Sequence, residues 1–214
     1  MKKILSIILL IIPFILIAIY WNELPDRIPM HWNAAGEVDR YSDSKWGIVA
    51  LPVVNLFTFL LLFIVPKIDP KGNFSQFLKT YWTIINILML FFVLLFMFVL
   101  YVSLGNDFNQ SMVIHSSLYV LFLLLGNFFG KLRPNYFIGI RTPWTLENEE
   151  VWKKTHRMGG VLWVASSVFM LIFNFILPDI GLKLFIPYVV VISIIPVAYS
   201  FIVFKQLTSK ETQN

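Results

Sequence analysis

The sequence predicts an all-α membrane protein with about six transmembrane helices, and three observations support this fold class. Hydrophobic residues make up 58% of the 214 residues and charged residues only 14%, whereas a soluble domain carries roughly a quarter charged residues. Phe occurs 21 times, which is more than one core of this size encloses, so lipid has to accept many of these side chains. Several apolar runs are also long enough to cross a bilayer.

Six apolar runs have the length of roughly 17–25 residues that a transmembrane helix needs. They are 4–21, 47–66, 82–105, 113–130, 161–178 and 186–204. The first run follows Lys2 and Lys3, as the apolar part of a signal peptide does, but it ends at Tyr20 and Trp21 without a small-x-small cleavage site. We therefore interpret the first run as a permanent transmembrane helix.

Positive charges on the loops predict the orientation of these helices. Alternating the loops between the two sides places thirteen of the 17 Lys and Arg residues on one side, and leaves for the other side Arg27, Arg40, Lys45 and Lys183. Because cytoplasmic loops are rich in Lys and Arg, both termini are predicted to be cytoplasmic. We expect a multi-pass membrane protein with two halves of three spans each, residues 1–110 and 111–214.

The loop at 22–46, which this orientation places outside, is too elaborate to be a simple connector. Pro25 and Pro29 favour extended backbone before them, and 33–36 supplies turn residues. We therefore expect an ordered cover over the outer ends of the helices. Its acidic residues and His31 match no metal-binding spacing, so local ion pairs are the preferred interpretation.

The second elaborate loop, 131–160, is predicted to lie on the cytoplasmic side. The pair at 142–143 is a threonine N-cap followed by proline in the first helical turn, and acidic residues precede basic ones after it. Apolar residues from Trp144 to Met158 fall on one stripe. This pattern predicts a short interfacial amphipathic helix that ends at the glycine pair 159–160.

The inner helix either only positions the neighbouring spans or offers a docking surface to a cytoplasmic partner. A docking surface would use arginine and tryptophan, which dominate many protein interfaces. The candidate docking residues are Arg133, Asn135, Arg141, Thr142, Trp144, Trp152, Lys153, Lys154 and His156.

Inside the six runs there is no Asp, Glu, Lys or Arg, which weighs against an ion pump. We expect Asn86, His115 and Asn127 to serve mainly as structural polar residues between helices, with a transport path as the alternative. The sequence contains no Cys, no phosphate-binding Gly-Lys-Ser/Thr loop, no His-Glu-x-x-His pair and no Gly-x-Ser-x-Gly turn. It therefore predicts no enzyme, no metal site and no cofactor.

The two loops also carry a resemblance to a known family. Residues 133–146, RPNYFIGIRTPWTL, and 150–157, EVWKKTHR, closely resemble the signature of the SdpI-like bacterial immunity proteins. The outer runs LPDRIP at 24–29, HWN at 31–33 and GEVDR at 36–40 are similar to the domain of unknown function that accompanies this signature. The resemblance covers nearly the whole chain.

This resemblance implies a multi-pass protein of the bacterial plasma membrane that protects its producer from a secreted killing-peptide toxin of the SdpC kind. Some members of the family also capture a small helix-turn-helix autorepressor at the membrane. We expect the inner loop to dock such a repressor, without direct contact to nucleic acid, and we expect the toxin to engage His31, Trp32, Asn33, Asp39 and Arg40. The alternative function is a small membrane transporter of a peptide or small molecule.

Overall fold

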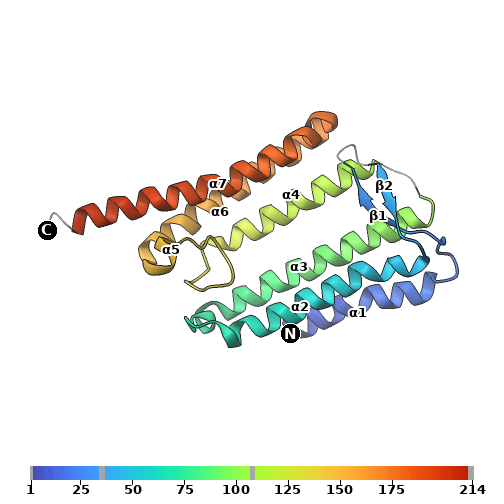
Figure 1. Cartoon of the computed structure of the whole chain (residues 1–214), viewed down its shortest axis with the longest axis horizontal. Coiled ribbons are helices and arrows are strands. Elements are labelled where there is room, and N and C mark those ends of the chain that lie inside the picture. The colour runs from blue at the N-terminus through green and yellow to red at the C-terminus, as the bar shows by residue number, and fades with distance from the viewer. Residues whose placement is uncertain (1, 34–36, 107–108, 212–214) are drawn as a thin grey trace.

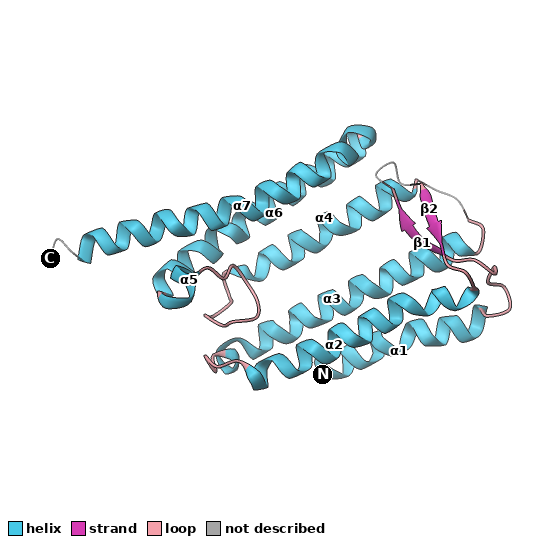
Figure 2. Ribbon diagram, in the orientation of Figure 1, coloured by secondary structure: helices cyan, strands magenta, loops and turns pink. Residues whose placement is uncertain are grey.

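The computed structural model describes residues 2–33, 37–106 and 109–211, and these residues form mainly long helices (Figures 1 and 2). In chain order the elements are α1 (Lys2–Tyr20), β1 (Pro29–Trp32), β2 (Val38–Tyr41), the 3-10 helix η1 (Lys45–Val49), α2 (Ala50–Ile68), α3 (Phe74–Ser103), α4 (Gln110–Phe129), α5 (Pro143–Glu147), α6 (Glu149–Ile176) and α7 (Pro178–Glu211). Six helical segments among the described residues are long and apolar enough to cross a membrane. The predicted fold class, an all-α multi-pass membrane protein, is confirmed.

The long helices run roughly along one direction in two groups (Figure 1). Helices α1, α2 and α3 pack together. Helix α4 contacts α3 on one side and packs against α6 and α7 on the other. The β1–β2 hairpin lies at one end of the helices, whereas the start of α1 and the end of α7 lie towards the other end. With both termini in the cytoplasm, as the charges predict, the hairpin end is the outer end and the loop before α5 lies at the inner end.

Buried apolar side chains gather in three clusters that lie along the helices. The first cluster surrounds Trp82 near the inner end, the second surrounds Phe96 beneath the hairpin, and the third joins Tyr119 of α4 to α6 and α7. Many other apolar side chains stay on the surface, for example Phe57 at 61% and Phe175 at 63% exposure. Such outward-facing apolar side chains suit hydrocarbon rather than water as the surrounding medium.

The prediction that the amphipathic helix ends at 159–160 is wrong. The segment instead divides at Asn148, whose side chain caps α6, and α6 then runs on through both glycines to Ile176. The reason is the close packing of α6 against α4, since a Cβ atom on Gly160 would lie only 2.7 Å from the carbonyl oxygen of Gly126. Small residues permit such close approach between membrane helices, so these glycines serve packing and do not end the helix.

The division into halves at residues 110 and 111 remains a prediction. It falls at the start of α4, but Leu132 and Trp152 from the second half belong to the buried cluster around α3. The two groups of helices therefore share part of one core at the inner end.

The orientation leads to a direct prediction, helped by the absence of native Cys. A membrane-impermeant maleimide should label Asp43→Cys, in the exposed segment before η1, in intact cells. It should label Ser209→Cys, near the exposed end of α7, only after the cells are permeabilised. Labelling of Ser209→Cys in intact cells would reverse the orientation.

Candidate functional site

At the outer end, the segment after α1 forms an antiparallel hairpin from β1 and β2. Main-chain bonds of 2.8 Å from Ser42 N to Ile28 O and of 2.9 Å from Asn33 N to Glu37 O hold its two sides together. His31 Nδ1 and Asp39 Oδ1 lie 2.6 Å apart on its exposed surface. The loop is ordered around these pairs, while residues 34–36 of the expected turn lie outside the described residues.

An apolar cavity of ≈ 270 Å³ lies beneath this hairpin. Its lining combines β1, η1, α2, α3 and α4, through Pro29, Met30, Trp32, Gly47, Ile48, Ala50, Leu51, Val54, Leu95, Phe98, Val99 and Ile114. The Trp32 ring lies 5.5 Å from the ring of Phe98, and Trp32 Nε1 donates a hydrogen bond to Gln110 Oε1 at the start of α4. Trp32 therefore joins the hairpin to both groups of helices and forms part of the cavity wall.

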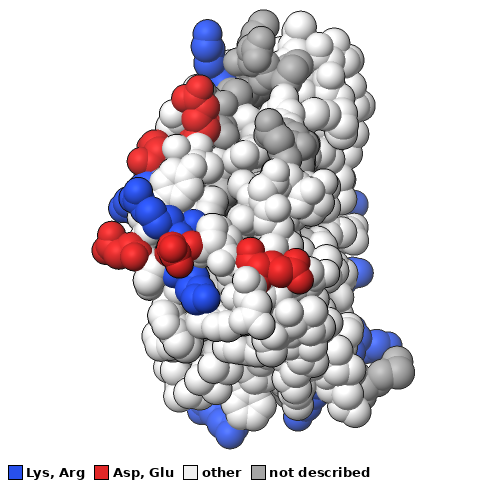
Figure 3. Space-filling view, turned by 90° about the vertical axis from the view of Figure 1, so that its right-hand side faces the viewer, with Lys and Arg blue, Asp and Glu red and all other residues white. Residues whose placement is uncertain are grey.

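The five expected toxin-engaging residues divide into three kinds of position. Trp32 is half-buried and lines the cavity, whereas His31, Asp39 and Arg40 are exposed on the hairpin. Asn33 bonds to Glu37 across the hairpin loop through its side chain as well as its main chain. Seen from this end, acidic and basic side chains gather together towards one side, and most of the remaining surface carries neither charge (Figure 3).

At the inner end, the segment between α4 and α5 is folded around the buried side chain of Asn135. Asn135 Nδ2 donates to the carbonyl oxygens of Arg133 and Ile138, at 2.8 and 3.1 Å. Asn135 Oδ1 accepts from the main-chain N–H groups of Phe137 and Ile138, at 2.9 and 2.8 Å. One fully buried amide thus satisfies four main-chain groups and fixes the course of this loop.

The next residues of the loop close onto α6 at His156. Gly139 has a φ of 105°, in the left-handed region, and a Cβ atom on it would fall on His156 Nε2. The N–H of Ile140 donates to this same Nε2 at 2.9 Å, while His156 Nδ1 lies 2.9 Å from the carbonyl oxygen of Trp152. The run 138–140 therefore brings the loop into close contact with His156, which is buried and, as the acceptor of the Ile140 N–H, neutral.

Helix α5 begins with the threonine N-cap that the sequence predicts. The N–H of Thr142 donates to Thr145 Oγ1 at 2.8 Å and the N–H of Thr145 donates to Thr142 Oγ1 at 3.3 Å, which is a reciprocal cap. Trp144 lies within α5. Its Nε1 donates to Ser200 Oγ of α7 at 2.6 Å, and its ring lies 5.3 Å from that of Phe201. Trp144 therefore attaches α5 to α7.

The structure separates the docking candidates by exposure. Asn135, Thr142, Trp152 and His156 are buried, whereas Arg133 and Trp144 are half-buried. The exposed candidates are Arg141, Lys153 and Lys154. Lys153 and Lys154 pair with Glu149 and Glu150 one turn earlier, at 3.0 and 2.7 Å, which the i,i+4 spacing favours. Of the docking candidates, these three cations are therefore the exposed ones, while the buried candidates shape the loop and its contact with α6.

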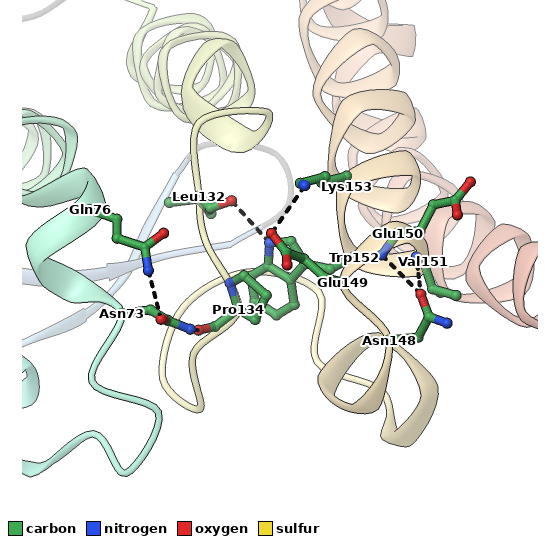
Figure 4. Close-up of polar contacts among 10 residues, drawn as sticks. All are labelled: Asn73, Gln76, Leu132, Pro134, Asn148, Glu149, Glu150, Val151, Trp152 and Lys153. Carbon is green, nitrogen blue, oxygen red and sulfur yellow. Dashed lines mark hydrogen bonds and ion pairs between the residues drawn. The ribbon is translucent and has the colours of Figure 1, made fainter.

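A second set of bonds attaches this loop and α5 to the turn between α2 and α3, and Figure 4 shows one of them, from Asn73 to Pro134. Asn73 Nδ2 donates to the carbonyl oxygen of Pro134 at 2.8 Å, and Asp69 Oδ1 accepts from the N–H of Tyr136 at 2.9 Å. Lys71 Nζ donates to the carbonyl oxygen of Leu146. We call these three contacts the inner clamp, because they tie the first group of helices to the loop of the second.

The polar residues expected within the spans face different neighbours. Asn86 Oδ1 accepts from Ser6 Oγ of α1 at 2.6 Å, and its Nδ2 donates to the carbonyl oxygen of Lys2. His115 bonds within α4 and its ring lies 4.9 Å from that of Phe185 of α7, while Asn127 lines a groove between α4 and α6. Asn86, His115 and Asn127 thus lie in separate places and do not line one polar path, so they give no support to the transport alternative.

Two parts of the candidate site could not be found from the sequence. The cavity is lined by apolar residues of the spans, such as Val54 and Ile114, which look like any lipid-facing residue in a sequence. The inner clamp uses Asp69, Lys71 and Asn73 from a short connection whose only signal is a polar, glycine-containing turn.

Comparisons with known proteins agree with the resemblance that the two loops carry. Residues 131–203 match the SdpI/YfhL protein family, and residues 8–56 match a domain of unknown function, DUF1648. The chain is 28% identical over 207 residues to the protein named Immunity protein SdpI of Bacillus subtilis (strain 168), which covers 96% of this chain and 97% of that relative. No solved structure matches it. The chain is thus a multi-pass bacterial membrane protein that is similar to the SdpI immunity protein over nearly its whole length.

Proposed function

We propose that this protein is a non-enzymatic membrane immunity protein that protects its producer against a secreted killing peptide. The observation that carries the proposal is the similarity, over nearly the full length of both chains, to a protein named for immunity. The apolar cavity beneath the hairpin supports it, because a membrane-active peptide offers apolar side chains that such a cavity accepts.

In this proposal the outer end recognises the toxin in two ways. The exposed His31, Asp39 and Arg40 contact polar or charged parts of the peptide, while the cavity beside Trp32 receives one apolar anchor. A few buried anchors of this kind contribute most of the affinity in many protein interfaces. The toxin is thereby held at the membrane surface before it inserts elsewhere.

The proposal is tested by survival of toxin-sensitive bacteria. Cells that express the chain should survive a challenge with a killing peptide of the SdpC kind, whereas cells with an empty vector should die. Membrane abundance is measured in the same cultures by immunoblot. Equal killing of both cultures, with the chain present in the membrane, contradicts the immunity function.

The inner loop is proposed to dock a small cytoplasmic helix-turn-helix repressor. Arg141 is the exposed docking candidate next to the buried Asn135 and Thr142, and its Nη1 donates to the carbonyl oxygen of Tyr136 at 2.6 Å. This bond orients a guanidinium group that has further N–H donors for a carboxylate of the partner. The loop is thus built to hold one arginine in a fixed position at the inner face.

Substitution of Arg141 separates docking from general attraction of charges. Arg141→Lys keeps the charge but loses the planar fork, so a docking role predicts that Arg141→Lys and Arg141→Ala both reduce co-fractionation of the repressor with membranes, by roughly tenfold or more. Toxin survival should be unchanged in both variants. Arg157→Ala, which removes an exposed arginine from α6, is the control and should retain the repressor.

Two other results would contradict the docking role of Arg141. Full recruitment by Arg141→Lys would mean that positive charge alone attracts the partner or the lipid. Joint loss of survival and membrane abundance in Arg141→Ala would make the residue part of the fold and not of a docking surface.

A further inference from the structure

An apolar groove lies between α1 and α3 at the inner end, away from both candidate surfaces. It has a volume of ≈ 630 Å³ and is lined by Lys2, Ile4, Leu5, Ile8, Leu9, Thr83, Asn86, Ile87 and Leu90. Ile8 and Leu90 are 49% and 43% exposed, so the groove opens towards the surrounding lipid. The groove therefore has an apolar lining, open to lipid, that suits a hydrocarbon chain.

A second cavity continues this groove at its inner end. It has a volume of ≈ 680 Å³, shares Lys2 and Ile4 with the first, and adds Lys3, Leu78, Lys79 and Trp82 to the lining. The combined groove is thus apolar along the helices and bears three lysines where the predicted orientation places the cytoplasmic headgroup layer.

Contacts with α3 hold two of these lysines, Lys2 and Lys3, at the inner end of the groove. Lys2 Nζ donates to the carbonyl oxygen of Lys79 at 2.9 Å and to Thr83 Oγ1. Lys3 Nζ lies 5.3 Å from the centre of the Trp82 ring. Among the described residues, none of the ion pairs includes Lys2, Lys3 or Lys79, and neither cavity has an acidic residue in its lining. The positive charge at this end of the groove is therefore not neutralised by the described side chains.

We propose that this groove binds an anionic phospholipid of the cytoplasmic leaflet. One acyl chain lies along Ile8 and Leu90, and the phosphate group lies among the three lysines. A soluble anion would leave the apolar groove empty, and a zwitterionic phospholipid would bring its own cation to the lysines. A lipid with an apolar chain and net negative charge matches both ends of the groove.

Binding at this place would stabilise the contact between α1 and α3. The buried bond of 2.6 Å from Ser6 to Asn86 joins the two helices at the floor of the groove. A lipid that contacts both helices binds the folded arrangement and not the separated helices, so it raises the unfolding temperature. This inference needs no toxin and no repressor, and its test is independent of the immunity function.

The experiment uses the full chain, purified in a neutral detergent. Thermal unfolding is measured with phosphatidylglycerol or with phosphatidylcholine of the same acyl chains, and lipid binding is measured by native mass spectrometry. Phosphatidylglycerol should raise the unfolding temperature more than phosphatidylcholine. In Lys2→Gln/Lys3→Gln/Lys79→Gln this difference should disappear, because each lysine is worth about fivefold in affinity for an anionic lipid.

The matched control is Lys67→Gln/Lys131→Gln/Lys205→Gln, which removes three exposed lysines from other places at the inner end. This control should keep the preference for phosphatidylglycerol. If both triple variants lose the preference equally, the effect is general surface attraction and the proposed site is wrong. If neither loses it, the lipid binds elsewhere.

A second pair of variants tests the apolar part of the groove without changing its charge. Ile8→Trp should obstruct the acyl chain and weaken binding of phosphatidylglycerol about tenfold. Ile7→Trp places the same side chain on the adjacent residue, which is 50% exposed and is not part of the groove lining, and should bind normally. Equal binding by both variants contradicts a seat for the acyl chain, and stabilisation by inorganic phosphate alone would identify a soluble anion as the ligand.

Discussion

Val54→Phe should abolish most of the protection that the protein gives against its toxin. Val54 lines the cavity beneath the hairpin, so a larger side chain there occupies the space proposed for the apolar anchor of the peptide. Loss of one buried anchor weakens binding by about 1.5–3 kcal/mol, which corresponds to roughly 10- to 100-fold in affinity. Survival under toxin should fall accordingly, while the amount of protein in the membrane stays the same.

The adjacent residue provides the control for this substitution. Val53 lies on the same helix and is 51% exposed, against 46% for Val54, but it is not part of the cavity lining. Val53→Phe should therefore protect as well as the wild type. Equal protection by Val53→Phe and Val54→Phe would exclude the cavity as the place where the toxin is recognised.

Gly139→Ala should destabilise the inner loop more than any other single change to a glycine at this end. The left-handed φ of Gly139 strains an alanine by about 1–3 kcal/mol, and the new methyl group would also meet His156. We expect a total loss of roughly 2–4 kcal/mol, visible as a lower unfolding temperature in detergent and as reduced recruitment of the repressor.

Two comparisons make this prediction specific. Gly130→Ala is the control, because Gly130 has a φ of −64° and no atom within 4 Å of the added methyl group. His156→Ala removes the ring that the methyl group meets, so the double variant should lose less stability than the sum of the two single changes. Strict additivity would mean that Gly139 and His156 are not in contact.

The helices were predictable from the sequence, because lipid selects for length and apolar composition, and both can be read without knowing the packing. The same is true of the threonine cap at Thr142, which depends on residues only three positions apart. The orientation remains a prediction from charge. The family resemblance was confirmed by comparisons that cover nearly the whole chain.

The role of the residues in the inner run, 133–157, was not predictable in the same way. Asn135, Gly139 and His156 are specific residues in a specific order, which fits a docking surface as well as an internal bond network. Only the structure shows that Asn135 and His156 bond to the main chain of Ile138 and Ile140, on either side of Gly139, and that Gly139 packs closely against His156. The continuation of α6 through Gly159 and Gly160 was likewise hidden, because it depends on Gly126 of another helix.

The inner clamp has a consequence for which substitutions this chain can tolerate. From the turn between α2 and α3 it uses the side chains of Asp69, Lys71 and Asn73, but from the loop it uses only main-chain atoms. Any residue except proline offers the N–H group that Asp69 accepts at position 136, and every residue offers a carbonyl oxygen. Substitutions can therefore alter the outward side chains of the loop while the joint between the two groups of helices stays intact.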